Sequence, residues 1–295
     1  MTAVSRFPHE RWWAYLFAAP PILGFLVFGL GPLIASFVLS FTRYDVLTPP
    51  EPVGFENYRR LFVEDFFIGK TLVNTAFYLL GLPLGMAVSL SIALLLDRVT
   101  RFRGFFRTVY FVPAVCSAVA LGLLWKWIYR TDYGLLSMAL AAIGIEDSPA
   151  WLSEPSLVKP SLVLIGIWTN LGYEVVVLLA ALKTVPRQLL EAAELDGASG
   201  WQRFRHVTFP AITPTLFFIS VTGTIAILQS FDQVWVMTRG GPAFASATYM
   251  LYIYVTGFQY FRMGYACAMA WLLGLVVLFV TWAQFRLARF WVVES

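Results

Sequence analysis

Long stretches without a charged residue constrain this chain more than any other feature of its sequence. A helix that crosses a bilayer needs about 20 apolar residues, and one charge at its centre costs roughly 2.5 to 3.5 kcal/mol. Six apolar windows lie between Arg11 and Arg43, Lys70 and Asp97, Arg107 and Lys126, Lys159 and Lys183, Arg205 and Asp232, and Arg262 and Arg286. Only Glu174 interrupts one of them. The sequence therefore predicts an all-α, polytopic membrane protein with six transmembrane helices in a single transmembrane domain, residues 1–295. The spans are predicted at about 13–41, 71–96, 107–128, 158–182, 210–231 and 263–285.

Composition supports this fold class. The chain is 59% hydrophobic and 13% charged, whereas about a quarter of the residues in soluble domains are charged. Cys116 and Cys267 both fall inside apolar spans, where cysteine is most often a small packing residue, so no disulfide or metal site is expected. The excess of basic residues that gives the net charge of +4 lies at the predicted membrane turns, where anionic lipid headgroups are the ordinary partner. No nucleic-acid partner is therefore expected.

Basic residues predict the orientation. Lys and Arg exceed acids at both ends of the chain, in the turn at 97–107 and in the segment 183–206, whereas the opposite segments are balanced. By the positive-inside rule the basic set faces the cytoplasm, so both termini are predicted to be cytoplasmic. Two segments on the other side, 42–69 and 130–156, are each predicted to hold a short helix.

Residues 184–209 form a charged, amphipathic loop between two apolar spans. Pro186 suits a first helical position, and Gly197 is a natural left-handed stop, so the first helix is predicted between them. Ser199 and Gln202 have the spacing of a capping box, which predicts a second helix. In the second helix Trp201, Phe204 and Val207 recur as an apolar stripe, and Pro210 and Pro214 are predicted to end it.

Helices this short are marginal in water, so a partner protein is expected to cover their apolar faces. The alternative is a loop that lies on lipid. It is disfavoured because its polar face carries Glu191, Glu194 and Asp196, where a lipid-binding helix would carry mostly Lys and Arg. We therefore interpret 184–209 as a docking loop.

The order Glu191-Ala192-Ala193, Asp196-Gly197-Ala198 and Pro210 resembles the EAA signature of the membrane subunits of binding-protein-dependent ABC importers. The resemblance is strongest to the carbohydrate branch, which includes permeases of the maltose and glycerol-3-phosphate types. It implies an ABC type I importer transmembrane-domain fold in a bacterial or archaeal cell (inner) membrane. The partners it implies are a second homologous permease subunit, two ATPase subunits and an extracytoplasmic solute-binding protein.

The resemblance also implies that motion of the ATPase pair enters this chain through the docking loop. The predicted coupling residues are Glu191, Ala192, Ala193, Asp196, Gly197, Trp201, Phe204 and Pro210. The chain contains no GxxxxGK[ST] phosphate loop, so it is not expected to be an enzyme. It is expected to bind no cofactor, because ATP and Mg would be bound by the partner subunits.

The fourth predicted span carries a polar stripe. Gly166, Asn170 and Glu174 recur at every fourth residue, and Tyr173 lies beside them. Intramembrane charges usually line a water-filled route or a bundle interior. Two interpretations remain open: that Trp168, Asn170, Tyr173 and Glu174 line the solute pathway, or that Glu174 makes a structural hydrogen bond to a neighbouring helix.

The fifth predicted span is expected to bring Thr222, Ile225, Gln229 and Asp232 or Gln233 onto one face. An aromatic ring, an amide and a carboxylate suit a sugar, because ring faces stack on C–H surfaces while polar groups select hydroxyls. Gln229, Phe231 and Asp232 are therefore further pathway candidates.

The predicted function is that of a permease subunit that moves a sugar or sugar-like solute from a binding protein into the cytoplasm. One alternative is the same machinery importing glycerol-3-phosphate or a glycerophosphodiester, although no Lys or Arg lies in the middle of a span to bind a phosphate. A more distant alternative is a stand-alone ion-coupled carrier that uses Glu174, which would leave the docking loop unexplained.

Overall fold

The computed structural model describes residues 8–98, 103–145 and 147–293 and divides into two compact units. Unit 1 comprises Met1–Asp65 and Ile253–Leu272, and unit 2 comprises Phe66–Tyr252 and Leu273–Ser295. Residues 99–102 of the predicted basic turn at 97–107 lie outside the described residues, as do Arg6 and Glu294.

The described residues of unit 1 form helices, one strand pair and three π-helical segments. Its elements are α1 (Pro8–Gly24), η1 (Phe25–Leu30), α2 (Gly31–Leu39), β1 (Thr42–Arg43), β2 (Glu51–Pro52), α3 (Glu56–Arg59), η2 (Arg60–Glu64), η4 (Val255–Gln259) and the first part of α15 (Met263–Ala288). The strands pair antiparallel, with Thr42 opposite Pro52. The short helical stretch at 56–64 confirms the helix predicted within 42–69.

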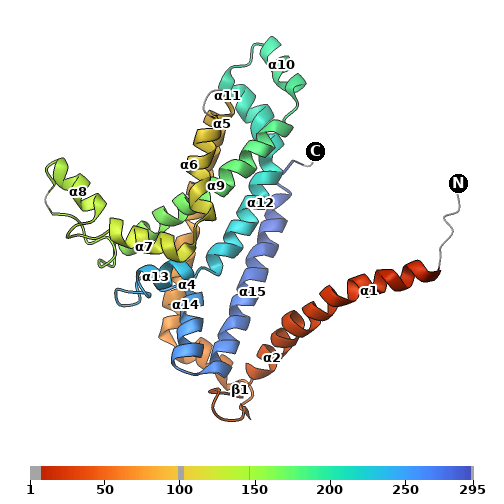
Figure 1. Cartoon of the computed structure of the whole chain (residues 1–295), viewed down its shortest axis with the longest axis vertical. Coiled ribbons are helices and arrows are strands. Elements are labelled where there is room, and N and C mark those ends of the chain that lie inside the picture. Colours follow the sequence, from red (N-terminus) through yellow and green to blue (C-terminus); the bar gives the residue numbers. More distant parts are fainter. Residues whose placement is uncertain (1–7, 99–102, 146, 294–295) are drawn as a thin grey trace. The chain divides into compact units, whose positions relative to one another are not determined.

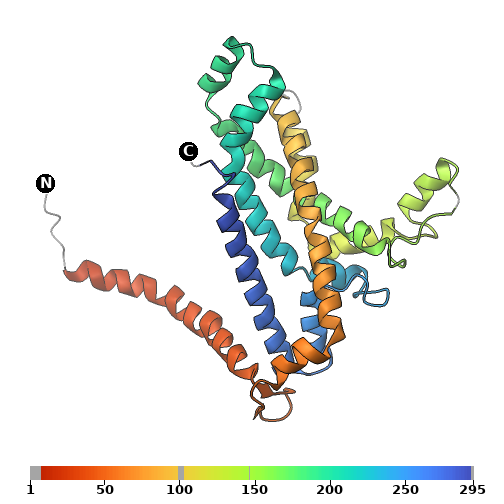
Figure 2. The ribbon, with the colours of Figure 1, turned by 180° about the vertical axis from the view of Figure 1, so that it is seen from behind.

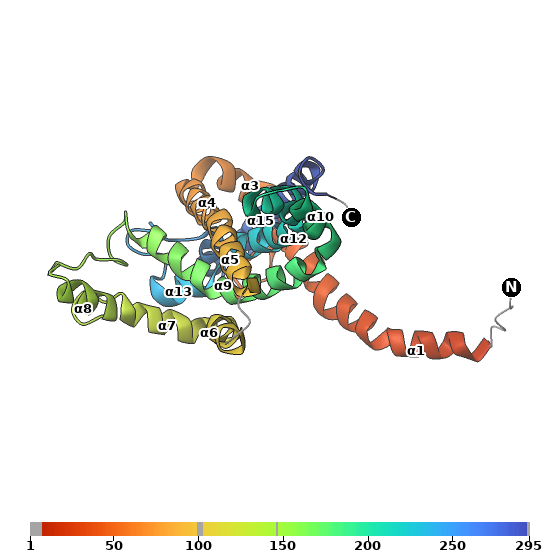
Figure 3. The ribbon, with the colours of Figure 1, turned by 90° about the horizontal axis from the view of Figure 1, so that it is seen from above.

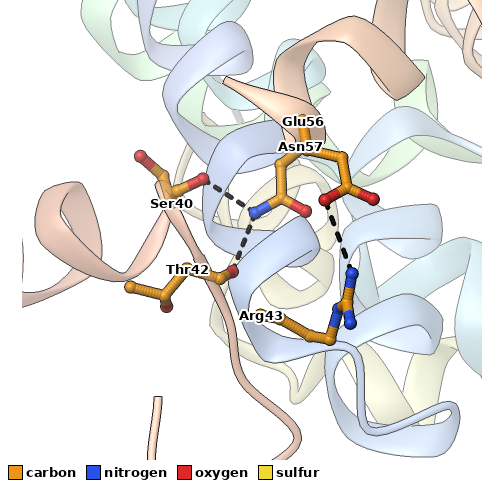
Figure 4. Close-up of polar contacts among 5 residues, drawn as sticks. All are labelled: Ser40, Thr42, Arg43, Glu56 and Asn57. Carbon is orange, nitrogen blue, oxygen red and sulfur yellow. Dashed lines mark hydrogen bonds and ion pairs between the residues drawn. The ribbon is translucent and has the colours of Figure 1, made fainter. Parts of the chain in front are cut away.

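Polar contacts fix the turn that follows α2. Asn57 Nδ2 donates hydrogen bonds of 2.9 Å to the backbone oxygens of both Ser40 and Thr42 (Figure 4). Arg43 Nη2 lies 3.4 Å from Glu56 Oε2 in the same view. Within unit 1, Trp271 of α15 packs edge-on against Phe37 with ring centroids 5.0 Å apart. These contacts tie α2 to the start of α15.

The described residues of unit 2 form helices joined by turns and loops. Its elements are α4 (Phe66–Leu79), α5 (Gly81–Arg98), α6 (Arg103–Val115), α7 (Ala118–Ile128), α8 (Leu135–Ala142), α9 (Val158–Thr184), α10 (Arg187–Leu195), α11 (Gly200–Arg203), η3 (Phe204–Thr208), α12 (Phe209–Leu228), α13 (Asp232–Met237), most of α14 (Tyr249–Tyr254) and the last part of α15. Helix α8 confirms the short helix predicted within 130–156.

The core of unit 2 lies where α5, α9 and α12 meet (Figure 1). Its buried side chains include Ala93 of α5, Val175 and Leu178 of α9, and Ile212 and Ile219 of α12. Small residues on α5 allow the close approach: a Cβ at Gly81 would lie 2.9 Å from Val163, and one at Gly85 would lie 3.5 Å from Ile167. This core holds α9, the helix with the polar stripe, against two neighbours.

Five helical stretches of the described chain are long and apolar enough to cross a membrane. They are Trp12–Leu39, Phe66–Asp97, Val158–Thr184, Gly200–Leu228 and Met263–Ala288. They confirm an all-α, multi-pass membrane protein. In place of a single helix at the third predicted span, 107–128, the structure has two segments, Thr108–Val115 and Ala118–Ile128, that meet at 110°. Ser117 has extended backbone at the start of α7, a position for which serine is well suited. Helix α6 contacts α9, whereas α7 contacts α13 (Figure 3).

Two predicted boundaries of the docking loop are wrong. Pro186 precedes the first helix as its N-cap, with ψ 121°, and Arg187 is the first helical residue. Pro210 and Pro214 do not end the second helix, because Gly200–Leu228 is one continuous helical stretch. The wide turn of η3, in which the Phe209 N–H bonds to Phe204 O, lets the chain continue past Pro210, which has no N–H to donate.

Candidate functional site

The first helix of the docking loop ends in a Schellman motif. The Ala198 N–H bonds to Ala193 O at 2.9 Å, and the Gly197 N–H bonds to Glu194 O at 3.0 Å. This pair of bonds requires a left-handed residue between them, and Gly197 has φ +78°. The sequence prediction of a helix stop at Gly197 is therefore confirmed.

The second helix begins with the predicted capping box. Ser199 Oγ accepts a bond of 3.3 Å from the Gln202 N–H, and Gln202 Oε1 accepts one of 2.7 Å from the Ser199 N–H. Arg203 Nη1 lies 2.6 Å from Glu194 Oε2, and this ion pair links α11 to α10. Spacing alone did not single out the Glu194–Arg203 pair, because the angle between the helices decides it.

Apolar side chains of the docking loop remain uncovered within unit 2. Leu195 is 90% exposed and Trp201 is 67% exposed, while Trp201 contacts Phe204 with ring centroids 5.5 Å apart. Glu191, Ala192 and Asp196 are exposed as well, whereas Ala193 and Pro210 are half-buried. Helices α10 and α11 project at one end of unit 2, beyond the ends of α5 and α12 (Figures 1 and 2). The loop thus presents a partly apolar surface whose two helices are joined by hydrogen bonds and an ion pair.

A cavity of about 300 Å³ lies inside unit 2. Residues from α4, α5, α9, α12, α13 and the segment between α12 and α13 line it: Tyr78, Gly81, Leu82, Gly85, Leu162, Val163, Gly166, Ile167, Asn170, Tyr173, Glu174, Ile219, Thr222, Gly223, Ala226, Ile227, Ser230, Gln233 and Val234. Apolar walls with a few polar groups are typical of small-molecule sites. The polar stripe predicted on the fourth span forms part of this wall.

Three of the four pathway residues predicted on α9 line the cavity. Asn170 and Tyr173 are exposed, and Glu174 is 7% exposed. Glu174 Oε2 accepts a hydrogen bond of 2.7 Å from Ser89 Oγ on α5. The two interpretations of Glu174 are therefore not exclusive, because one side chain both lines the cavity and bonds to a neighbouring helix.

The other predicted pathway residues are absent from the lining of this cavity. The Trp168 ring packs edge-on against Trp125 with centroids 5.3 Å apart, and the Phe231 ring stacks on Trp235 at 5.9 Å. Gln229 and Asp232 are exposed. Of the face predicted on the fifth span, Thr222 and Gln233 line the cavity, whereas Ile225, Gln229 and Asp232 are absent from its lining. The predicted face is interrupted because α12 ends at Leu228 and Phe231 has non-helical backbone. A pathway role for Trp168, Gln229, Phe231 and Asp232 stays a prediction.

Tyr78 and Ser230 also line the cavity, and neither was predicted from the sequence to lie in the pathway. Tyr78 OH donates to Ser246 O at 2.9 Å, and Thr248 Oγ1 donates to Ser230 O at 2.8 Å, so the segment 238–248 holds both residues. The repeat of small residues Gly81, Gly85 and Ser89 was the available signal that α5 packs closely on a polar helix.

Metal binding finds no support in the part of the chain that the structure describes. His, Cys, Asp and Glu side chains there form no group of three or more that could hold a metal ion. Cys116 and Cys267 are free thiols.

Comparisons with known proteins agree on one family. A family model described as "binding-protein-dependent transport system inner membrane component" matches residues 81–292. A probable ABC transporter permease protein, YesP of Bacillus subtilis, is 35% identical over 94% of this chain and 91% of its own length. The lactose transport system permease protein LacF of Rhizobium radiobacter is 34% identical over 98% of this chain and 99% of its own length. Among solved structures, a bacterial ABC transporter involved in the import of the acidic polysaccharide alginate has a chain with TM-score 0.85 and 25% identity, covering 95% of this chain and 96% of that one.

Proposed function

The chain belongs to the family of binding-protein-dependent transport system inner membrane components. From that premise we propose a role in an importer for each of its two sites, the docking loop and the cavity. The chain is a transmembrane permease subunit of an ABC importer of the carbohydrate type. Both units described above are proposed to belong to one transmembrane domain, since the family match at 81–292 includes residues of each.

The docking loop is proposed to couple this subunit to a partner ATPase. Its exposed Leu195 and Trp201 are the observation that supports docking, because apolar side chains on a rigid helical surface are stabilised when a partner covers them. Glu191, Ala192, Ala193, Asp196, Gly197, Phe204 and Pro210 complete the proposed coupling set. ATP and Mg would be bound, and ATP hydrolysed, by that partner.

The cavity in unit 2 is proposed to form part of the solute pathway. The single observation that carries this proposal is the row formed by Asn170, Tyr173 and Glu174, which brings polar groups to an otherwise apolar cavity inside a membrane protein. The solute is proposed to be a sugar or sugar-like molecule, in line with the name of the relative LacF, a lactose transport system permease protein.

The assembly is proposed to contain a second homologous permease, two ATPase subunits and an extracytoplasmic solute-binding protein. A related solved complex, the alginate transporter, includes a pentasaccharide-bound periplasmic protein, which supports the last of these partners. Both termini and the docking loop are proposed to face the cytoplasm, in a bacterial or archaeal inner membrane, because their segments carry the excess of basic residues.

Purification of the chain with its neighbours tests this function. We expect soluble ATPase subunits to co-purify and their ATP hydrolysis to be stimulated by a solute-loaded binding protein. Uptake by the isolated chain, driven by a proton or sodium gradient without ATP, would instead establish the ion-coupled carrier that Glu174 alone could suggest.

A further inference from the structure

We propose that the cavity selects neutral solutes that donate hydrogen bonds and rejects anions, with Gln233 as a specificity-determining residue. The proposal rests on the proposed function, since it takes the cavity as the solute pathway. It follows from the acceptor oxygens that the polar side chains bring to the cavity and from the lack of a cationic side chain among its lining residues.

Gln233 is oriented by a single bond. Its Nε2 donates to Leu162 O at 2.8 Å. Only the nitrogen end of an amide can bond to a carbonyl, so Oε1 must occupy the other end of the group. A Cβ built on Gly166, which lines the cavity, would lie 3.7 Å from Gln233 Oε1, so this acceptor lies beside the cavity wall of α9.

Two polar residues on α9 are also bonded to the protein at one end and have an oxygen left over. Asn170 Nδ2 donates to Gly166 O at 2.9 Å, which leaves Oδ1 as the free end of that amide. Glu174 Oε2 accepts a hydrogen bond from Ser89 Oγ, which leaves Oε1 as the second oxygen of that carboxyl group. Across the described ranges, no hydrogen bond is recorded for Gln233 Oε1, Asn170 Oδ1 or Glu174 Oε1. Three acceptor oxygens are therefore left for a solute.

Two hydroxyl groups of the wall donate their protons to backbone oxygens of the protein. Tyr78 OH donates to Ser246 O at 2.9 Å, and Thr222 Oγ1 donates to Phe218 O at 2.8 Å. A hydroxyl has one proton, so both groups now offer lone pairs only. The second N–H of each amide and the hydroxyls of Tyr173 and Ser230 remain as donors, but the lining still offers more acceptor oxygens than donors.

Positive charge is missing from the same wall. The lining residues, all of them within the described chain, include no Lys, Arg or His. Lys159, one turn before Leu162 on α9, is engaged elsewhere: its Nζ donates to Asn74 Oδ1 at 3.2 Å and lies 5.0 Å from the centre of the Phe77 ring. A phosphate or carboxylate in the cavity would face acceptor oxygens without a cation, which is costly in an apolar surrounding. Sugar hydroxyls can instead donate to all three oxygens.

Direct binding to the complete importer complex in lipid nanodiscs tests the proposal, with its binding protein left out so that only the permease selects. The neutral probes are lactose, maltose and trehalose, and the anionic probes are glycerol-3-phosphate and a disaccharide of uronic acids. For the wild type we expect binding of at least one neutral probe and weaker binding of both anions. For Gln233→Lys we expect the ratio of neutral to anionic affinity to fall by about tenfold or more, because the new ammonium group would attract an anion and remove an acceptor.

Asn170→Lys is the second variant, in case Gln233→Lys fails to fold, and it should shift the ratio in the same direction. Gln259→Lys is the matched control: it makes the same change at an exposed residue outside the cavity and should leave the ratio unaltered. Tighter wild-type binding of an anion than of every neutral probe would overturn the proposal, as would binding of no probe at all. An unchanged ratio in whichever lysine variants fold would also overturn it. Stimulation of ATP hydrolysis by the loaded binding protein, measured on the same complex, separates these failures from failure of the proposed function.

Discussion

Ser89 Oγ donates a 2.7 Å hydrogen bond to Glu174 Oε2 and so joins α5 to α9 inside unit 2. Both residues are buried, Ser89 to 1% exposure and Glu174 to 7%. A buried polar group without a partner costs about 1–3 kcal/mol, so the bond stabilises the packing of the two helices. It also constrains the orientation of the carboxyl group of Glu174, a residue that lines the cavity.

Substitution of Glu174 separates its two roles. In Glu174→Gln the amide oxygen can still accept from Ser89, so we expect the melting temperature of the complex to change little. The group that faces the cavity changes, and we expect solute uptake to fall by about tenfold, which corresponds to the loss of one strong hydrogen bond. Thermal unfolding and uptake by the reconstituted complex measure the two effects.

Ser89→Ala is the complementary variant. It removes the donor, leaves Glu174 without this partner and should destabilise the complex by about 1–3 kcal/mol. If Glu174→Gln transports with unaltered rate and specificity, Glu174 has no role in the pathway and its function is structural.

Gly172 marks the closest approach of α9 to α6. A Cβ at this position would clash with the backbone oxygen of Tyr110 and lie 3.0 Å from Phe111 Cα. Backbone cannot move aside as a side chain can, so we expect Gly172→Ala to destabilise the complex by about 1–3 kcal/mol.

The matched control is Gly69→Ala in α4, where a Cβ would meet nothing within 4 Å. It should be neutral or slightly stabilising, because alanine is the better helix former. Equal melting temperatures for Gly172→Ala and the wild type would show that α6 does not pack against α9 in this way.

Gly197 is needed for the geometry of the docking loop. Its φ of +78° costs about 1–2 kcal/mol for a residue with a Cβ, and a β-branched side chain fits worst. We expect Gly197→Val to misplace α11 relative to α10, so that ATP hydrolysis continues while uptake falls. The ratio of solute taken up to ATP hydrolysed measures this uncoupling.

Gly200→Val makes the same change three residues later, at a glycine with open space and no positive φ, and should leave the ratio closer to that of the wild type. Normal coupling in Gly197→Val would contradict the assigned role of the loop.

Charge reversal at Glu191 tests the docking surface without altering the fold of the loop. Glu191 is exposed on α10, so Glu191→Lys should have an effect of less than about 0.5 kcal/mol on stability. We expect less solute to be taken up per ATP hydrolysed, because repulsion between like charges, or the loss of a contact, weakens the interface between the docking loop and the ATPase. Wild-type coupling in this variant as well as in Gly197→Val would refute the assignment.

The capping box supports the second helix. Ser199→Ala removes the acceptor for the Gln202 N–H and should cost about 1 kcal/mol, whereas Ser199→Asp keeps an acceptor in place. We expect coupling to fall in Ser199→Ala and to be largely retained in Ser199→Asp. Loss of coupling to the same degree in both variants would mean that the Ser199 hydroxyl acts in some other way than as a cap.

The docking loop was largely predictable because its shape depends on interactions between near neighbours. The Schellman motif at Gly197 spans Ala193 to Ala198, and the capping box spans Ser199 to Gln202, so residue type and spacing determine both. The end of the second helix was not predictable from its prolines, because the wide turn before Pro210 lets the helix continue into the membrane span.

By itself the sequence determined that this chain is a helical membrane protein with an EAA-type loop, since both features are local: a run of apolar residues, and a short motif of fixed spacing. Only the tertiary structure decided that the third span bends by 110°, that Gln233 rather than Gln229 lines the cavity, and that Ser89 reaches Glu174, 85 residues away. These outcomes depend on how helices pack against one another. A side chain's neighbours across a helix interface are set by the rotation and end points of two helices together, which no single stretch of sequence encodes.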